Sequence, residues 1–141
     1  MGAVVVDTNI VSYLFKRDTR VRGYRRHLLG NDLVLSFMTV AELDNWAARR
    51  RWGQTRREAL DRHLQGYAVY YADRELCRTW ATVNDRARRA GRPIAEADAW
   101  IAATALLLDV ALVTHNAADF AMVEGLRVLS EPPSNSPSSA P

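Results

Sequence analysis

Apolar and polar positions along the chain follow two patterns, short continuous apolar runs and stripes with helical spacing. Residues 3–6 form an apolar, largely β-branched run that stops at Asp7, which is typical of a strand buried on both faces. Ile10, Leu14 and Phe15 then recur at the spacing of one helix face. The chain is therefore predicted to open with a buried strand followed by a helix.

The same two patterns continue to about residue 129. A helical stripe covers residues 21–28 and ends near Gly30. Further strands are predicted at 33–37, 68–71, 111–114 and 126–129, and further helices at 39–51, 56–64, 73–91, 96–108 and 117–122. Strands that alternate with helices predict an α/β fold in which a mainly parallel sheet is covered by helices on both faces.

Length and composition bound the organisation of the chain. With 141 residues, 48% of them hydrophobic, the chain can bury one sizeable core, and we expect a single domain over residues 1–130. Residues 131–141 are mostly Pro, Ser, Asn and Ala, and we predict a disordered tail there. No apolar run approaches the roughly 20 residues that span a bilayer, and no signal peptide is apparent, so we expect a cytoplasmic protein.

The net charge is modest, but the basic residues are unevenly spread. The formal net charge is +3 at pH 7, and Lys16 is the single lysine. Two stretches hold most of the local excess of arginine: Arg49, Arg50, Arg51, Arg56 and Arg57, and Arg86, Arg88, Arg89 and Arg92. Such stretches can contact phosphates, or they can simply be solvated helix faces, and charge alone does not decide between the two.

Acidic residues gather at the predicted ends of strands. Asp7 follows the first strand, Glu42 lies early in the helix after the second, and Asp98 lies early in the helix before the fourth. Asn116 and Asp119 follow that fourth strand. Because ligands of open α/β sheets bind beyond the carboxyl ends of the strands, these side chains are expected to share one cleft. Carboxylates that crowd together favour a compensating cation such as Mg²⁺ or Mn²⁺.

Each acid also has a purely structural interpretation. Asp7 can cap the helix that follows it, and Thr39 with Glu42 matches a capping box, in which Glu42 reaches back to the backbone N–H of Thr39. Asp98 lies where a helix dipole favours negative charge, and Asp119 can cap a short helix of its own. A functional interpretation therefore depends on the whole set.

Several other acidic or phosphate-binding classes lack a required residue. A receiver domain needs paired acids at its first strand and a lysine near them, but the only lysine of this chain is Lys16. A haloacid-dehalogenase-type phosphatase needs a second acid two positions after the first, where this chain has Asn9. No glycine-rich loop ending in Lys-Ser or Lys-Thr is present, which argues against a P-loop. The three histidines, His27, His63 and His115, do not have zinc-ligand spacing.

Four segments in order resemble one family. They are Val-Val-Val-Asp-Thr-Asn at 4–9, Thr-Val-Ala-Glu-Leu at 39–43, Asp-Ala-Trp-Ile-Ala-Ala-Thr-Ala at 98–105 and Val-Thr-His-Asn-Ala-Ala-Asp-Phe at 113–120. The set resembles the PIN-domain family, and in particular the VapC-type ribonuclease toxins of bacterial toxin–antitoxin pairs. The resemblance covers residues 4 to about 129 and implies a three-layer α/β/α fold with a central, mainly parallel sheet.

The resemblance implies a Mg²⁺- or Mn²⁺-dependent endoribonuclease that cleaves cellular RNA, with tRNA or ribosomal RNA as expected targets. It makes Asp7 and Asp98 the principal metal ligands and Glu42 a ligand either directly or through water. Many relatives carry an Asp in place of Asn116, so either Asp119 or a water held by Asn116 is expected to fill the fourth catalytic position. It assigns the orientation of these carboxylates to hydrogen-bonding neighbours: Thr8, Asn9, Thr114 and Asn116.

The resemblance also implies partners, a cognate VapB-type antitoxin and a second copy of the chain in a homodimer. Trp46 and Trp52 could line the groove for the antitoxin or pack in the core. Trp80 and Trp100 are expected in the core or at the dimer contact. Because Asn116 replaces an acid, a non-catalytic PIN-fold module that binds RNA or protein is the alternative, and a DNA nuclease is a third possibility.

Overall fold

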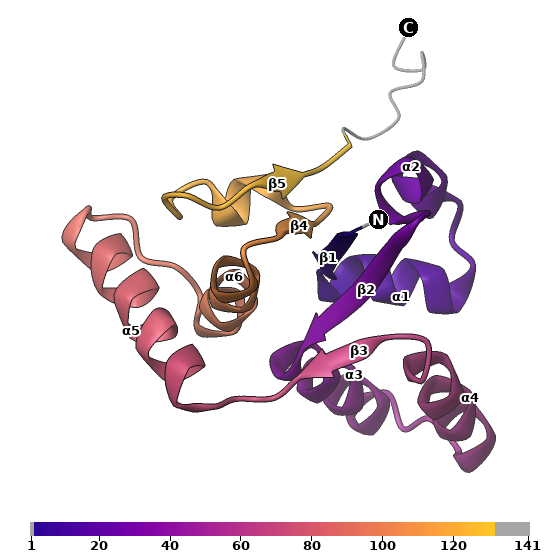
Figure 1. Ribbon diagram of the computed structural model, residues 1–141. Coiled ribbons are helices and arrows are strands. Elements are labelled where there is room, and N and C mark those ends of the chain that lie inside the picture. The colour runs from indigo at the N-terminus through magenta and orange to yellow at the C-terminus, as the bar shows by residue number, and fades with distance from the viewer. Residues whose placement is uncertain (1, 132–141) are drawn as a thin grey trace, which may run out of the picture.

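A five-stranded parallel sheet forms the centre of the computed structural model, which describes residues 2–131 (Figure 1). The order of the strands across the sheet is β3-β2-β1-β4-β5, and every neighbouring pair is parallel. Their bounds are Gly2–Val6 for β1, Asn31–Ser36 for β2, Ala68–Tyr70 for β3, Ala111–Val113 for β4 and Val128–Leu129 for β5. The strand order reverses between β1 and β4, which is the position where α/β sheets of this kind bind ligands.

Helices cover both faces of this sheet, and Figure 1 shows α5 and α6 on one side and α1, α2 and α4 on the other. The helices are α1 (Thr8–Lys16), α2 (Arg25–Leu28), α3 (Phe37–Arg49), α4 (Gln54–Leu64), α5 (Arg74–Arg89) and α6 (Glu96–Leu108), with 3-10 turns η1 (Thr19–Tyr24) and η2 (Ala117–Phe120). Among residues 2–131, no helix is long and apolar enough to cross a bilayer. The predicted three-layer α/β/α fold is confirmed.

Strand β1 is buried on both faces, as its continuous apolar run predicts. Val4 and Val6 pack on one face in a cluster that includes Ile10 of α1. Val5 points to the other face and packs against Ile101 of α6. Side chains alternate along a strand, so one short run can hold both layers of helices onto the sheet. The end of this strand is consequently a fixed point from which a functional side chain can be presented.

Helix α6 is apolar nearly all round because it lies between two neighbours. Ala102 and Ala105 pack toward the sheet, whereas Ala99 packs with Val83 and Ala87 of α5. A helix buried on two sides lacks a polar face, and small side chains let both neighbours approach closely. The bounds of α6 agree with the predicted helix at 96–108.

Helix α3 begins at Phe37, two residues before the predicted start at Thr39. The reason is local, because the Ser36 hydroxyl accepts a 3.1 Å hydrogen bond from the Met38 N–H and so caps the helix earlier. The stripe at 21–28 is likewise divided, with a 3-10 turn before the short α2. Helix α5 is capped by Asp73, the residue at which this helix was predicted to begin.

Glu131 belongs to the folded domain, although the composition of the chain predicts that the tail starts there. Its carboxylate accepts hydrogen bonds from Arg26 and from Nε2 of His27, the latter at 2.7 Å. Its backbone N–H lies 3.1 Å from Oη of Tyr24. The ordered contacts thus extend one residue past the predicted boundary, and residues 132–141 of the predicted tail lie outside the described residues.

Candidate active site

Asp7 lies at the carboxyl end of β1, at the point where the strand order reverses. Its backbone N–H donates a 2.9 Å hydrogen bond to the carbonyl of Val113, which ties the end of β1 to the end of β4. Its Oδ1 accepts from the Thr8 N–H at 2.8 Å, and its Oδ2 accepts from the Thr114 hydroxyl at 2.6 Å. The residue is 5% exposed. Asp7 therefore caps α1, as one interpretation expected, and is also held rigidly at the sheet edge.

Glu42 does not form the predicted capping box. Because α3 begins at Phe37, Thr39 lies inside the helix and is buried, and Ser36 is the capping residue. The Glu42 carboxylate reaches α1 instead, where its Oε1 accepts a 2.6 Å hydrogen bond from the Thr8 hydroxyl. The hydroxyls of Thr8 and Thr39 lie 3.0 Å apart, within hydrogen-bond distance. The structural interpretation of Glu42 as a cap is therefore wrong. Its carboxylate lies beside Thr8, which also binds Asp7.

Asp98 and Asp119 bring two more negative charges to the same place. Asp98 lies in the first turn of α6, and the exposed Asp119 lies in η2. Burial raises the pKa of Asp98 to about 7, and the charges of Asp7, Asp119 and Glu42 add to the increase. Burial also raises the pKa of Asp7, although its hydrogen bonds from Thr114 and Thr8 act in the opposite direction. Four segments of the chain thus place four interacting carboxylates at one edge of the sheet.

Asn9 and Asn116, which were expected to orient the site carboxylates, form no side-chain hydrogen bond to them among residues 2–131. The backbone N–H of Asn116 donates a 3.0 Å hydrogen bond to the Thr114 hydroxyl, the same hydroxyl that donates to Asp7. Asn116 thus supports the residue that orients Asp7. The side chain of Asn9, which was expected to orient a carboxylate, makes no hydrogen bond to these acids within the described residues. Asp119, rather than Asn116, supplies a charge that acts on both Asp7 and Asp98.

Two residues of this region were not identified from the sequence. Thr39 was expected only as a helix cap, whereas its hydroxyl lies against Thr8. Tyr24 was expected as one apolar position of a helical stripe, whereas its buried Oη lies 2.6 Å from Nδ1 of His115 and 3.4 Å from the carbonyl oxygen of Thr114. The spacing of Thr39 from Glu42 indicated only a helix cap, and the apolar periodicity at Tyr24 indicated only burial, so neither signal predicted the polar contact.

The donors at this edge are all carboxylate and hydroxyl oxygens, which are the ligands that Mg²⁺ and Mn²⁺ prefer. A cation would also relieve the repulsion that raises the pKa of Asp98. Within residues 2–131, no three or more His, Cys, Asp or Glu side chains lie together as a group that could hold a metal ion. The chemistry of the donors fits a hard divalent cation, and the expected coordination remains a prediction.

Comparison with known proteins agrees with this architecture. The family model described as the PIN domain matches residues 4–126. The chain belongs to the PIN-domain family. Ribonuclease VapC1 of Haemophilus influenzae strain R2866 is 34% identical over 125 residues, which cover 87% of this chain and 93% of that protein. VapC ribonuclease Y4jK of Sinorhizobium fredii is 31% identical over 126 residues, covering 83% and 89%.

Solved structures give the same assignment of the PIN fold. VapBC-1 from nontypeable Haemophilus influenzae has a TM-score of 0.77 at 30% identity, covering 92% of this chain and 98% of that chain. VapBC2 from Rickettsia felis, solved bound to a DNA fragment from the promoter, has a TM-score of 0.81 at 20% identity, covering 94% of this chain and 100% of that chain. At this lower identity the second comparison supports the fold alone.

The tryptophans of this PIN domain lie in two separate places. Trp46 and Trp52 both pack against the core cluster on the α1 side of the sheet, as the core interpretation expected. Trp52 lies beyond the end of α3, so only Trp46 shares a helix with Glu42. Trp80 and Trp100 stack on each other with ring centroids 4.8 Å apart, between α5 and α6. Both of these rings are partly buried inside the monomer.

Proposed function

We propose that this PIN-domain protein is a VapC-type ribonuclease toxin that cleaves cellular RNA and is restrained by a cognate antitoxin. The observation that carries the proposal is that Thr8 joins Asp7, at the end of β1, to Glu42 of α3 by hydrogen bonds at the carboxyl edge of the sheet. The charges of Asp7, Glu42 and Asp119 also raise the pKa of Asp98 in α6, next to the effect of burial. The relatives named as VapC ribonucleases, which align over most of their length, support it. A relative named toxin FitB, from Neisseria gonorrhoeae, is 28% identical over 125 residues.

Asp7 and Asp98 are the proposed principal ligands of a Mg²⁺ or Mn²⁺ ion, with Glu42 completing the set directly or through water. When bound, such an ion neutralises charge on a phosphate and lowers the pKa of a bound water. Asp119 supplies the fourth acidic charge. The hydroxyls of Thr114 and Thr8 hold Asp7 and Glu42 by hydrogen bonds of 2.6 Å each, so these carboxylates are oriented before any ligand arrives.

The proposed substrate is RNA in the cytoplasm, with tRNA and ribosomal RNA as the expected targets. The proposed partners are a VapB-type antitoxin and a second copy of the chain. The relative of known structure that supports an antitoxin is VapBC-1 from nontypeable Haemophilus influenzae, at 30% identity. Co-expression with an antitoxin encoded beside this chain should yield a stable complex on size-exclusion chromatography, and light scattering should give a dimer mass for the free chain.

The decisive experiment is cleavage of RNA by the purified protein with Mg²⁺, with Mn²⁺ and with EDTA. Asp7→Asn and Asp98→Asn should each abolish the metal-dependent cleavage and relieve growth arrest on expression. Glu96→Gln is the matched control, because Glu96 is exposed in the same first turn of α6 but does not act on the site carboxylates. Full activity of both Asn variants would overturn the proposal.

One observation favours a second candidate, a PIN-fold module that binds RNA or protein without cleaving it. The resemblance to VapC-type toxins implies an acid at the position of Asn116, which here contributes a backbone N–H rather than a charge. Titration calorimetry at pH 7 separates the two candidates, because the non-catalytic module should bind neither Mn²⁺ nor Mg²⁺. Cation binding that Asp98→Asn removes would favour the nuclease.

A further inference from the structure

Helix α3 carries two further residues of interest on the face that presents Glu42. Trp46 and Arg49 follow Glu42 by four and seven residues, so all three lie along one side of the helix. With a rise of 1.5 Å per residue, Trp46 lies about 6 Å and Arg49 about 10 Å farther along the helix axis than Glu42. Arg50 follows as the C-terminal cap residue of the same helix. We call Trp46, Arg49 and Arg50 the α3 stripe.

The two arginines of the α3 stripe are available for a ligand. Both are exposed, and within residues 2–131 neither forms an ion pair with a carboxylate. The guanidinium carbon of Arg50 lies 5.2 Å from the centroid of the Trp46 ring. The three side chains border an open hollow of about 380 Å³. Their polar groups thus face a space large enough for a ligand group rather than a protein neighbour.

The end of α3 is held in place independently of these side chains. Arg57 of α4 donates from Nη2 to the carbonyl of Ala47 at 3.2 Å and from Nε to the carbonyl of Trp52 at 2.9 Å. The other carboxylate of α3, on the exposed Asp44, follows Glu42 by two residues and so lies on a different face. The α3 stripe is therefore a set of cationic and aromatic side chains carried on a fixed helix end beside an acidic site.

We propose that the α3 stripe binds the single-stranded RNA that flanks the cleaved phosphate, with Arg49 and Arg50 contacting phosphates and Trp46 stacking on a base. This proposal rests on the proposed ribonuclease function and adds the surface that holds the substrate. A cluster of four carboxylates repels a polyanion, so cations beside the cluster must supply much of the attraction. Arginine and an aromatic ring side by side are the combination that binds single strands without reading their sequence.

The test is RNA binding measured apart from cleavage. A fluorescein-labelled single-stranded RNA oligonucleotide is titrated with the full chain in EDTA, and the dissociation constant is followed from low to moderate salt. The logarithm of the association constant falls linearly with the logarithm of the salt concentration. Each phosphate that the protein no longer neutralises should make this slope less steep by about 0.7. The slope of the double variant Arg49→Gln/Arg50→Gln should therefore be smaller by about 1.4, and this variant should bind more weakly at every salt concentration.

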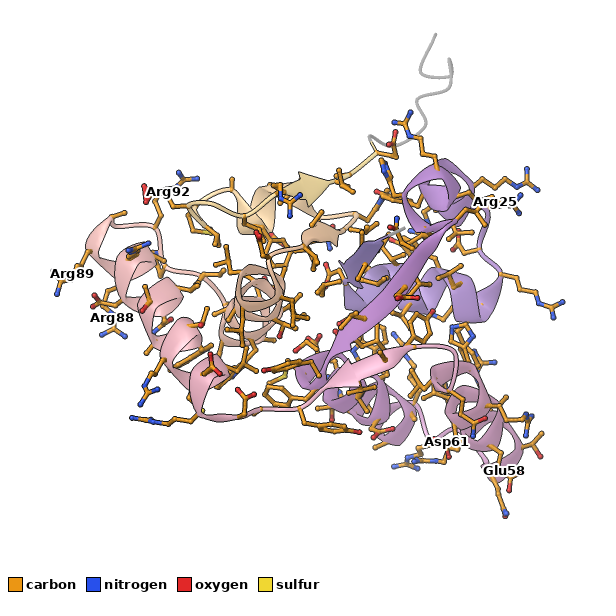
Figure 2. The ribbon with its side chains drawn as sticks, in the orientation of Figure 1. Arg25, Glu58, Asp61, Arg88, Arg89 and Arg92 are labelled. Atoms are coloured by element: carbon orange, nitrogen blue, oxygen red, sulfur yellow. The ribbon has the colours of Figure 1, made fainter. Side chains whose placement is uncertain are left out.

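Arg88→Gln/Arg92→Gln is the matched control. It removes the same net charge from exposed positions at and just beyond the C-terminal end of α5, and Figure 2 shows Arg88 and Arg92 at the opposite end of the molecule from Glu58 and Asp61 of α4. Because that end is remote from α3, the control should retain the wild-type slope. Equal losses in both double variants would reduce the effect to general charge and overturn the proposal.

Trp46 is tested separately, because its ring also packs against the core. Trp46→Leu should weaken RNA binding about tenfold, whereas Trp46→Phe should retain most of the affinity, since it keeps an aromatic face. Thermal unfolding identifies any loss that comes from the fold, and Trp52→Leu controls for loss of a packed indole. Identical RNA affinity in Trp46→Leu and the wild type would contradict the stacking role.

The outcomes also separate this proposal from the proposed function. Loss of RNA binding in Arg49→Gln/Arg50→Gln, with binding intact in Asp98→Asn, supports the α3 stripe whether or not the chain cleaves RNA. If RNA binding is unchanged but a co-expressed antitoxin dissociates from the arginine variant, the stripe is a protein contact and the proposal is wrong. If the wild type cleaves RNA but Arg49→Gln/Arg50→Gln binds RNA as tightly as the wild type, the ribonuclease function stands and the RNA-binding role of the α3 stripe is wrong.

Discussion

The Thr8 hydroxyl donates a 2.6 Å hydrogen bond to Oε1 of Glu42, and this contact joins the first turn of α1 to the second turn of α3. The adjacent Thr8 N–H holds Oδ1 of Asp7 at 2.8 Å. One buried residue therefore orients two of the four site carboxylates, one through its backbone and the other through its side chain. A hydroxyl at position 8 should matter more to the site than to the fold.

Thr8→Val tests that relationship, because it removes the hydroxyl and keeps the shape of the side chain. Glu42 loses its donor, so the Mn²⁺ concentration needed for half-maximal cleavage should rise about 10- to 100-fold. The free energy of unfolding should fall by only about 1–2 kcal/mol. Thr8→Ser is the control that retains the hydroxyl and should behave as the wild type. If Val and Ser variants require the same Mn²⁺ concentration, the hydrogen bond does not organise the site.

Asp98 should make the metal-free protein less stable as the pH rises. Its pKa is raised from 3.8 to about 7 by burial and by its acidic neighbours, so between these values the folded state holds a proton that the unfolded chain has released. The free energy of unfolding in EDTA should therefore decrease from pH 4 toward pH 7. Asp7, whose pKa is also raised, contributes in the same direction.

Urea unfolding at pH 5 and pH 8 in EDTA measures this dependence. Asp98→Asn should reduce the loss of stability between the two pH values, while Asp44→Asn, on another face of α3, should not. A saturating divalent cation should stabilise the wild type more at pH 8 than at pH 5, because protons compete with it for the carboxylates. An identical loss in wild type and Asp98→Asn would exclude Asp98 as its source.

Tyr24 is expected to stabilise the C-terminal end of the domain. Its buried Oη lies 2.6 Å from Nδ1 of His115 and 3.1 Å from the backbone nitrogen of Glu131. Tyr24→Phe leaves both groups without this partner and should lower the free energy of unfolding by about 1–3 kcal/mol. Tyr70→Phe removes a hydroxyl whose bond to Asp73 is exposed, and it should have little effect. Equal changes in the two variants would contradict the role of Tyr24.

The layers of the fold could be predicted from the sequence because they depend on local periodicity. The apolar run at 3–6 and the apolar helical segment at 96–108 each predict burial through a single local pattern. Both elements were found where expected. Asp7 directly follows β1 and Asp98 lies in the first turn of α6, as their local patterns predicted, whereas their role as metal ligands stays a prediction. Patterning of this kind is the part of structure that a sequence expresses most directly.

The contacts between the site residues could not be predicted, because they depend on how distant segments meet. Thr39 and Glu42 have the spacing of a capping box, yet Ser36 caps α3 and releases both side chains toward Thr8. Which residue caps a helix is decided by one turn of backbone geometry, and two candidates three residues apart have nearly equal preference. The contact of the Tyr24 hydroxyl with His115 could not be predicted either, because an apolar stripe does not indicate which group a tyrosine hydroxyl will contact.

The fourth position of the site should depend on Asp119 more than on Asn116. The charge of Asp119 acts on Asp7 and on Asp98, whereas Asn116 reaches the site through its backbone N–H to Thr114. Asp119→Asn removes that charge and should lower metal-dependent cleavage about 10-fold or more, while Asn116→Ala keeps the backbone donor and should retain most activity. Initial rates on one RNA substrate at saturating and limiting Mn²⁺ compare the two variants. A larger loss in Asn116→Ala would assign the fourth position to the asparagine side chain, because only the amide distinguishes that variant from the wild type.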